Sequence, residues 1–365
     1  MTMLASQQRF IPLFFGVCCL LIMIGILFVY SASSVYALEH HGSAHYYAIR
    51  HIFGIMLGCG AACIVYFMPL SLVRFLVPYA FVSSLLLTML TFISGYAIRV
   101  HGSSRWLHLV GCVFQPSELV KFSFIIYLAY LLAQSPSISW RRYMHFLFIM
   151  GITSGVLLAQ PDFGLAVTLS VTTFFMLFLA GARLSYLVLT FLACMPLLAV
   201  LIFYKAYRLQ RIMTFLNPWA DPQGTGFQII QSLIAIGSGG WYGVGVGNSK
   251  QKFFYLPMQH TDFIFSIIAE EIGFIGISIL LFLFLLFLYS GLKLAFALRD
   301  RFSHYTVLGF VVLVSLQTCI NSAVATGMAP TKGIGLPFIS YGNSALVCTI
   351  GMLGLIANMV RNNGR

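Results

Sequence analysis

The chain has 365 residues, of which 60% are hydrophobic and only 8% are charged. About a quarter of the residues in an ordinary soluble domain are charged, so this composition excludes a soluble globular protein. The formal net charge of +12 follows largely from the loop cations that orient a membrane protein, and it requires no nucleic-acid partner.

Apolar runs of about 20 residues recur along the whole chain and predict an all-α, polytopic membrane protein that forms a single membrane domain over residues 1–365. The runs are continuous, whereas a transmembrane β-barrel would show short alternating segments. We expect ten transmembrane helices, at residues 10–30, 48–67, 73–95, 117–134, 143–160, 164–181, 184–204, 263–290, 304–327 and 338–360.

The loop cations predict the orientation of these helices. If both termini are cytoplasmic, the cytoplasmic segments hold ten Lys and Arg residues, and the short outer segments hold four. Short loops weigh most in the positive-inside rule. We therefore expect a multi-pass protein of the cytoplasmic (inner) membrane with both termini in the cytoplasm.

A long extracytoplasmic loop, residues 205–261, precedes the eighth span in this topology. Apolar and polar residues alternate between Phe227 and Ile236, which predicts a short helix lying in the membrane interface. The following stretch GSGGWYGVGVG predicts a mobile or tightly turning connection. The chain contains no GxxxxGK[ST] phosphate loop, so we expect no nucleotide cofactor. It also shows no matched pair of interrupted helices like those of inverted-repeat transporters.

Charged residues inside apolar runs are the next candidates for function. Glu118 and Lys121 are three residues apart at the start of the fourth span, so they share a helix face. Intramembrane charges usually pair or face a cavity. This pair is therefore either a structural ion pair or part of a substrate cavity, and the two roles are compatible. Asp162 follows Pro161 and is interpreted as the N-cap, and so the support, of the sixth span.

The stretch HTDFIFSIIAEE carries three of the eight carboxylates in the chain. His260, Thr261 and Asp262 form a polar cluster at the predicted outer face, where Asp262 is either a helix cap or a catalytic acid that meets a substrate from the outer leaflet. Glu270 lies about 12 Å deeper along the helix. Glu270 and Glu271 point in different directions, so at least one needs a partner inside the bundle, and both are interpreted as supporting residues.

Five blocks between residue 105 and about residue 345 resemble the signature blocks of the SEDS (FtsW/RodA) family and occur in the same order. They are RWLHLVGCVFQPSELVKF, QPDFGLAV, FLNPWADPQGTGFQIIQSLIAIGSGG, GVGVGNSKQKFFYLPMQHTDFIF and GMAPTKGIGLPFISYG. NPWADPQGTGFQ and GNSKQKFFYLP are more similar to the division branch of the family than to the elongation branch. Met258 stands where the family commonly has an acid, and Asn343 and Ala345 replace Gly and Ser in another block.

The resemblance implies a GT-C-like membrane fold and a peptidoglycan glycosyltransferase that polymerises lipid II at the outer face of the membrane during cell division. It implies that Asp262 is the essential acid and that Glu118 and Lys121 form a functionally important pair. It also implies a complex with a class B penicillin-binding protein, which is a transpeptidase, and with other membrane proteins of the divisome.

Formation of a β-linkage from an α-linked donor requires inversion, so a single general base suffices, and Asp262 is assigned that role. The departing pyrophosphate needs cationic partners. The candidate substrate-binding residues are Lys332, Arg105, Arg208, Arg211, His260, Thr261 and Ser340. Contact with lipid headgroups is the alternative role of the four cations. A divalent cation, Mg²⁺ or Mn²⁺, would help to neutralise the pyrophosphate, but the sequence shows no ligand cluster for a metal.

Two other classes of function fit parts of the sequence. A lipid II flippase would also use ten spans with buried Glu and Lys residues, although transporter sites usually lie near the midplane. A non-catalytic division scaffold would tolerate loss of the charge at Asp262. Assays of lipid II flipping and of lipid II polymerisation distinguish these alternatives.

Overall fold

The structure, a computed structural model, describes residues 2–93, 97–100, 103–109, 112–135, 137–204, 206–253, 256–257 and 259–363. The long helices are α1 (Thr2–His41), α2 (Tyr46–Phe67), α3 (Leu70–Leu90), α4 (Pro116–Ala133), α5 (Trp140–Ala159), α6 (Phe163–Leu179), α7 (Leu184–Phe203), α10 (Ile264–Ala297), α11 (Arg301–Ala325) and α12 (Asn343–Asn362). The shorter helices α8 (Ala206–Leu216) and α9 (Phe227–Gly239) lie between α7 and α10, separated by the 3₁₀ turn η1 (Pro218–Ala220).

These ten long helices coincide with the ten predicted spans. Among the described residues, nine of them are long and apolar enough to cross a membrane, while α6 has only 17 residues. Large apolar side chains such as Phe67, Phe148 and Phe203 are exposed along the helices, as lipid-facing residues are. The all-α, multi-pass membrane class is confirmed, and the count of ten spans stays a prediction.

Five predicted span boundaries are wrong by five residues or more. Helix α1 begins at Thr2 instead of residue 10, and α3 ends at Leu90 instead of residue 95. Helix α1 continues to His41 and α10 continues to Ala297, beyond the expected ends at residues 30 and 290. Helix α12 begins at Asn343 instead of residue 338. The residues just before α12 are apolar enough to read as a span, but they form a turn that bonds to the segment preceding α10.

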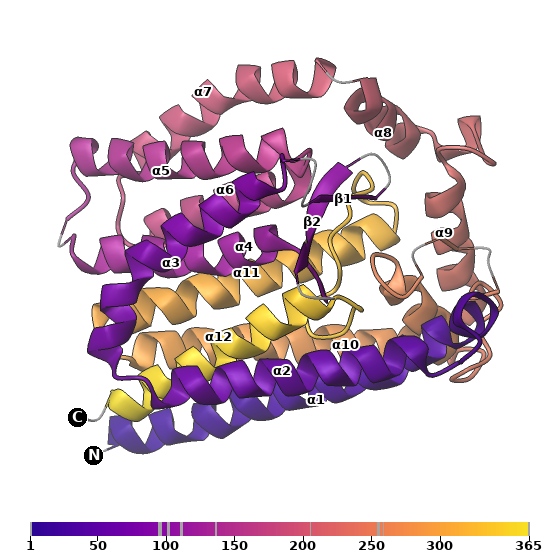
Figure 1. Cartoon of the computed structure of the whole chain (residues 1–365), viewed down its shortest axis with the longest axis horizontal. Coiled ribbons are helices and arrows are strands. Elements are labelled where there is room, and N and C mark those ends of the chain that lie inside the picture. Colours follow the sequence, from indigo (N-terminus) through magenta and orange to yellow (C-terminus); the bar gives the residue numbers. More distant parts are fainter. Residues whose placement is uncertain are drawn as a thin grey trace.

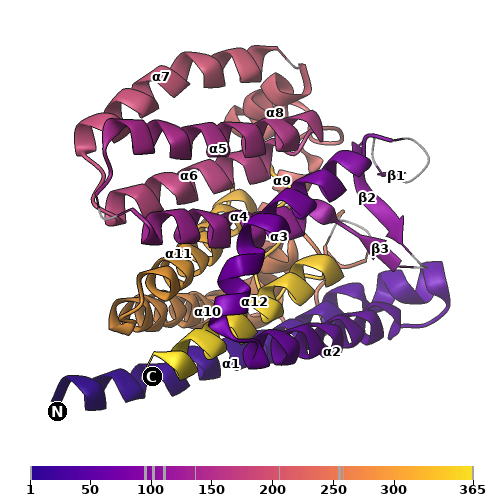
Figure 2. The same ribbon diagram turned by 60° about the vertical axis from the view of Figure 1, so that its left-hand side comes forward.

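The helices pack in layers that bring distant parts of the chain together (Figure 1). Helix α12 packs against α2, α1 packs against α10, and α11 lies between α10 and α4. Helices α5 and α7 lie at the edge of the bundle opposite α1 and α2. Thr190 is the one buried residue among those described in α7. Figure 2 shows the same separation from another side. Both termini lie at one end of the bundle, and α8 and α9 lie at the other.

A small antiparallel sheet lies between α3 and α4 and was not predicted from the sequence. Its strands are β1 (Ala97–Val100), β2 (Ser103–Leu109) and β3 (Cys112–Phe114), in the order β1-β2-β3. In the register, Ala97 pairs with Leu107, which also pairs with Phe114. The side chain of Leu107 is buried, so the sheet is anchored to the bundle, and β2 carries Arg105 toward the loops at this end.

Helix α10 is interrupted at Gly273, where φ is +68°. The interruption leaves backbone groups without helical partners, and the glycine-rich loop supplies them. Phe274 N donates to Gly240 O (2.8 Å), while Val244 N donates to Glu270 O (3.0 Å). The loop therefore completes the helix, which confirms the predicted tight turning.

Candidate active site

Asp262 lies directly before α10, and its backbone is held by a side chain of α11. The amide nitrogen of Asn321 donates to Asp262 O (2.8 Å) and to Ile334 O (2.8 Å). Asn321 is buried among helices, where leaving a polar amide without partners would be costly. One side chain thus joins the segment that carries Asp262 to the loop that follows α11.

The two residues before Asp262 are held by the turn before α12. Ser340 Oγ donates to Thr261 O (2.7 Å) and accepts from Leu336 N (2.6 Å), while Tyr341 N donates to His260 O (2.9 Å). Three consecutive carbonyl groups, those of residues 260–262, therefore accept bonds from other segments. The Ser340 hydroxyl, predicted to bind substrate, is bonded to the protein backbone.

The carboxylate of Asp262, in contrast, accepts no hydrogen bond from the residues that the structure describes. It is partly exposed. A Cβ atom added at Gly333 would lie 3.3 Å from Asp262 Oδ2, so the loop backbone passes close beside the carboxylate. A rigidly held backbone with an unoccupied carboxylate is the arrangement that a general base needs.

Arg105 of β2 approaches the same end of the bundle. Its guanidinium donates to Gln160 O (3.3 Å) and to Pro161 O (2.5 Å), and Arg105 Nη1 lies 4.0 Å from Asp162 Oδ2. Asp162 Oδ1 also accepts from Leu165 N (3.2 Å), which confirms its predicted role as the N-cap of α6. Arg105 thereby fixes the sheet against the start of α6.

Arg208 and Lys332, from α8 and the loop after α11, both lie at the ring of Phe163. The distances to the ring centroid are 5.1 Å from Arg208 Cζ and 5.9 Å from Lys332 Nζ. Arg208 is buried and donates to Leu201 O (2.7 Å) and Tyr207 Oη (3.0 Å). It is therefore largely committed to the corner between α7 and α8, whereas Lys332 forms no ion pair with a described residue.

Arg211, one turn further along α8, donates to Thr331 O (3.1 Å). This bond ties α8 to the loop that carries Lys332. The structure therefore gathers the four predicted cations, Arg105, Arg208, Arg211 and Lys332, around the starts of α6 and α10, although they come from three separate segments.

The electrostatic balance at this site shifts the pKa of Asp262. Burial raises the pKa to about 6, although Arg105 and Arg211 oppose the rise, and Asp162 adds to it. Burial also raises the pKa of Asp162 and lowers that of Lys332. A carboxyl group that titrates just below neutral pH can both take up and release a proton under working conditions.

His260 lies in a cluster of aromatic rings contributed by α1, α2 and the turn before α12. Its ring centroid is 4.6 Å from that of Tyr47, 5.7 Å from Tyr341 and 5.8 Å from Tyr36. Burial lowers the pKa of His260 to about 4, so the imidazole is neutral at physiological pH. Within the predicted polar cluster of residues 260–262, His260 therefore packs among aromatic rings, whereas Asp262 presents its carboxylate.

Glu118 and Lys121 form the predicted ion pair on α4. Lys121 is buried, whereas the Glu118 side chain is 16% exposed. Both charges influence the titration of Asp162 after the larger effects of burial and Arg105, so the pair lies within electrostatic reach of the site. This placement is compatible with both roles predicted from the sequence.

Glu270 and Glu271 are both buried, and each has partners. Glu270 accepts from Ser249 Oγ and from Lys250 N (2.9 Å). Glu271 accepts from Ser31 Oγ (2.6 Å) and lies 3.8 Å from Lys252 Nζ. The two acids therefore attach the segment before α10 to α10 and α1, and the predicted need for a partner inside the bundle is met.

Asn321, Gly333 and Gln160 also belong to the site and were not predicted. A polar Asn within an apolar span was the available signal for Asn321, while the other two positions depend on tertiary contacts. The replacement at Met258 lies outside the described residues. Asn343 is the first residue of α12, and its buried Oδ1 has no described hydrogen-bond partner.

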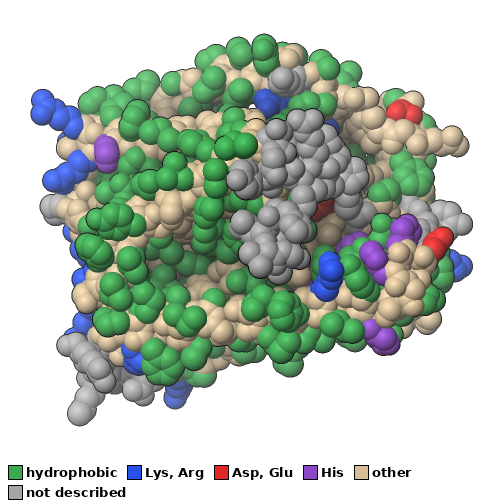
Figure 3. Space-filling model, viewed as in Figure 1, with side chains coloured by type: hydrophobic (Ala, Val, Ile, Leu, Met, Phe, Trp, Pro, Cys, Tyr) green, Lys and Arg blue, Asp and Glu red, His purple; other side chains and the backbone are tan. Residues whose placement is uncertain are grey.

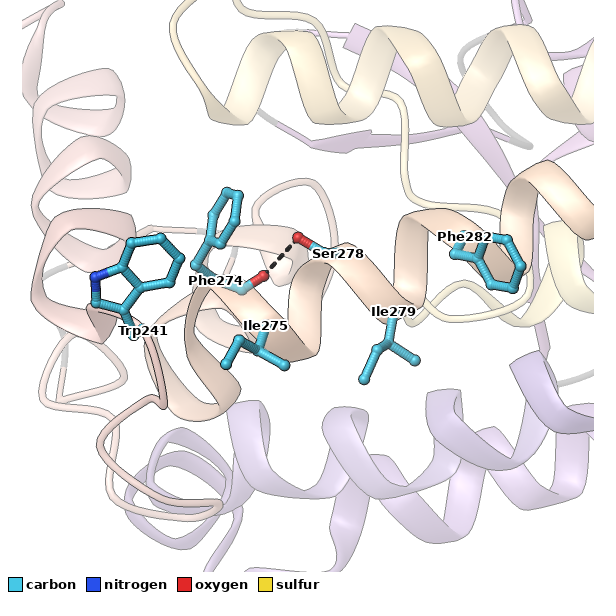
Figure 4. Close-up of a pocket in the computed structure, with 6 residues that line it drawn as sticks. All are labelled: Trp241, Phe274, Ile275, Ser278, Ile279 and Phe282. Atoms are coloured by element: carbon cyan, nitrogen blue, oxygen red, sulfur yellow. Dashed lines mark hydrogen bonds between the residues drawn. The ribbon is translucent and has the colours of Figure 1, made fainter.

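A hollow on the surface of α10 contrasts with this polar site (Figure 4). It lies beside the interruption at Gly273 and is lined by Trp241, Phe274, Ile275, Ser278, Ile279 and Phe282. The Ser278 hydroxyl donates to Phe274 O (2.7 Å). The hollow offers hydrocarbon contacts and no ionisable group, so it is not a second reaction site.

The fold and this site define a multi-pass helical membrane protein that holds a free carboxylate among cations at one end of the bundle. The family model FTSW_RODA_SPOVE, described as cell cycle protein, matches residues 12–364. The chain therefore belongs to the FtsW/RodA/SpoVE family, as its sequence blocks indicated.

Individual relatives agree with this membership. The chain is 41% identical to the probable peptidoglycan glycosyltransferase FtsW of Trichlorobacter lovleyi, over 92% of this chain and 89% of that protein. Its fold matches a chain from a study of the structural coordination of polymerization and crosslinking by a peptidoglycan synthase complex, with a TM-score of 0.80, 30% identity, and coverage of 96% and 97%. The rod shape determining protein RodA of Thermus thermophilus matches with a TM-score of 0.72, 25% identity and the same coverage.

Proposed function

We propose that the chain is an inverting peptidoglycan glycosyltransferase that polymerises lipid II during cell division. The relative from Trichlorobacter lovleyi is named a probable peptidoglycan glycosyltransferase. The observation that carries the proposal is the carboxylate of Asp262, which is free of described hydrogen bonds while the backbone on which it stands is held by Asn321, Ser340 and Tyr341. This geometry supports a base that is fixed in position and available to substrate.

In the proposed reaction, a sugar hydroxyl of the acceptor attacks the anomeric carbon of the donor. Asp262 takes the hydroxyl proton, a new glycosidic bond forms, and the bond to lipid pyrophosphate breaks with inversion. Positioned general-base catalysis contributes about 10²–10⁴-fold in rate. Lys332, Arg211 and Arg105 would neutralise the pyrophosphate; Lys332 has the fewest protein partners of the three.

A divalent cation would supply further positive charge to the pyrophosphate. Within the described residues, no group of three or more His, Cys, Asp and Glu side chains is placed to hold a metal ion. The donor set therefore does not fit a dedicated protein metal site, and the proposed steps rely on the cations of the chain itself.

We also propose that the chain acts in a complex with partner proteins. The solved relative belongs to a complex in which polymerization and crosslinking are coordinated. This supports a complex of the present chain with a class B penicillin-binding protein, whose transpeptidase would crosslink the new strand, together with other divisome membrane proteins.

A flippase receives less support from the interruption in α10. Interrupted helices hold substrates in transporters because their backbone groups are open to a cavity. Here the glycine-rich loop bonds to the interrupted backbone, and Glu270 and Glu271 are occupied by Ser249 and Ser31. The structure therefore favours the carboxylate near the end of the bundle over a site at mid-depth.

The test is a comparison of Asp262→Asn with Asp221→Asn in purified protein supplied with labelled lipid II. Asp262→Asn should reduce glycan polymerisation by at least about 100-fold, because the amide cannot accept the proton. Its thermal stability should be unchanged or higher, because burial of the charge raises the pKa of Asp262 and so disfavours the ionised native state.

Asp221 is the matched control, since it is exposed in the same loop region and its side chain bonds only to Thr225 (2.8 Å to the backbone N). Asp221→Asn should retain polymerisation. Undiminished polymer from Asp262→Asn would exclude Asp262 as the base, and retained flipping with no polymerisation by the unaltered protein would favour a transporter.

A further inference from the structure

A second polar pocket lies at the end of the bundle opposite Asp262, beside the two termini. It is formed by Arg74 of α3, by Tyr130 and Gln134 at the end of α4, and by residues 299–302, which follow α10 and begin α11. Its volume is about 500 Å³, within the usual range of about 300–1,000 Å³ for small-ligand pockets. Neither the proposed reaction nor the predicted partners use it.

The pocket has a surplus of positive charge. Arg74, Arg299 and Arg301 line it, together with a single acid, Asp300. Burial alone would raise the pKa of Asp300, but hydrogen bonds from Ser303 and the nearby Arg74 lower it below its usual value. Asp300 is therefore ionised and offsets only one of the three guanidinium charges.

Several donors in the pocket remain available. Arg74 Nη2 pairs with Asp300 Oδ2 (2.7 Å), and Arg74 Nε is buried out of a ligand's reach, so Arg74 contributes mainly its charge. Arg301 Nη2 donates to Ser135 O (2.8 Å), and the exposed guanidinium of Arg299 has no ion pair or hydrogen bond among the described residues. A ligand with several anionic oxygens would satisfy these donors.

One wall of the pocket is aromatic. Arg74 Cζ lies 5.5 Å from the centroid of the Phe302 ring, and Phe302 meets Tyr130 edge-on at 6.4 Å. The pocket lies where α3, α4, α10 and α11 reach their ends, which is the boundary between hydrocarbon and water for a spanning helix. Phosphate oxygens would meet the arginines there, while attached acyl chains would continue along the apolar helices.

We infer that this pocket binds the phosphate headgroup of an anionic phospholipid, and that a diphosphate lipid such as cardiolipin suits its two uncompensated charges best. Basic pockets between helices on the cytoplasmic side bind such headgroups in other membrane proteins. The inference concerns a face remote from Asp262, so it does not depend on the proposed glycosyltransferase activity.

The test measures thermal stabilisation of the detergent-solubilised full chain by cardiolipin, with phosphatidylethanolamine, inorganic phosphate and pyrophosphate as comparison ligands. Arg299→Gln should weaken the apparent affinity for cardiolipin about fivefold, as expected for one lost basic contact. Without lipid, its melting temperature should be unchanged, because the Arg299 side chain has no described partner to lose.

Arg141→Gln is the matched control, since Arg141 is also exposed beside a helix end but does not line the pocket. It should leave the affinity for cardiolipin unchanged. Equal weakening by both substitutions would show attraction to surface charge in general and would overturn the inference. Stabilisation by inorganic phosphate or pyrophosphate that matches cardiolipin would assign the pocket to a soluble anion and would also overturn it.

Discussion

The carboxylate of Asp262 differs from the buried acids of the chain because it accepts no hydrogen bond from a described residue. Glu270 and Glu271 are saturated by hydroxyl, backbone and ammonium donors, and Asp162 caps a helix. The Asp262 carboxylate lies within electrostatic reach of Arg105 and Arg211 but accepts no described hydrogen bond. Its proton affinity is therefore set by burial and by charges that a bound pyrophosphate would partly neutralise.

The pKa of Asp262 predicts the pH dependence of polymerisation. The base must be ionised, and burial places its pKa at about 6. The polymerisation rate, measured at a saturating concentration of the penicillin-binding partner and a low concentration of lipid II, should therefore be constant above pH 7. Below pH 6 it should fall about tenfold per pH unit, as the protonated fraction grows. Initial rates of polymer formation between pH 5 and 8 measure this dependence. A rate that stays flat down to pH 5 would contradict the assigned pKa.

Asn321 is predicted to be a positioning residue. Asn321→Ala removes the bonds to Asp262 O and Ile334 O, so the carboxylate loses its alignment with the acceptor hydroxyl. We expect kcat to fall at least about tenfold, with little change in KM and an unaltered midpoint in the pH profile. Rates at varied lipid II concentration separate these parameters.

Ser322→Ala is the control for Asn321→Ala, because the neighbouring Ser322 hydroxyl bonds only to Thr318 O and Cys319 O within α11. It should retain full activity. If the two variants lose activity equally, α11 as a whole is being disturbed and the positioning role is wrong.

The composition of the site was predictable because its charged residues are rare in an apolar chain. Asp262, Asp162 and the Glu118–Lys121 pair stand out on that ground, and the cap and the ion pair were confirmed. The donors that hold residues 260–262 were not predictable, since Asn321 and Ser340 are 59 and 79 residues away in the chain. Their sequence context resembles that of ordinary polar residues within or beside helices.

At the level of elements, the interruption in α10 connects the glycine-rich loop to the helix that follows Asp262. Gly239, Gly243 and Gly273 make close backbone approaches: a Cβ at Gly243 would overlap Glu271 O, and one at Gly273 would overlap Gly243 N. These glycines are required by contact and, at two positions, by positive φ. The first turns of α10 are thus stabilised by the loop that precedes them.

Gly273→Ala should destabilise the protein markedly. Alanine at φ +68° and ψ −170°, a backbone conformation open essentially only to glycine, costs about 1–3 kcal/mol, and the overlap with the loop backbone adds to this cost. We expect a lower melting temperature, measured by size-exclusion chromatography of heated samples, and a loss of polymerisation. Gly237→Ala in α9 is the control, because a Cβ there meets nothing within 4 Å. A Gly273→Ala protein as stable as the control would show that the interruption carries no strain.

Elements were predicted best where a single apolar run forms a single helix. The expected boundaries of α2, α4, α6 and α7 differ from the observed ones by two residues or fewer. Prediction failed where tertiary contacts override the run: the residues before α12 bond to His260 and Thr261, and α10 is interrupted by a loop. The predicted helix near residue 230 exists as α9, but Ser232 bonds to Ala325 O (2.6 Å), so one face packs against the bundle.

At the scale of the whole molecule, one face shows how the basic side chains are distributed along the bundle. Lys and Arg side chains line the edge that carries both termini, and several His side chains lie toward the opposite end (Figure 3). The face seen in Figure 3 is hollowed between the layers of helices. This distribution agrees with the positive-inside prediction, under which Asp262 faces outward and the arginine pocket faces the cytoplasm.

This orientation predicts opposite accessibility for two exposed positions, Gln223 in the α8–α9 connection and Ser137 before α5. A membrane-impermeant thiol reagent should label Gln223→Cys in intact spheroplasts and should label Ser137→Cys only after permeabilisation. The unaltered chain measures the background from its own eight cysteines. Neither substitution removes a described side-chain contact, because the bond that Ser137 accepts from Arg142 ends on its backbone oxygen. The reverse labelling pattern would place Asp262 on the cytoplasmic side, away from any acceptor strand outside the cell, and would exclude polymerisation at the outer face.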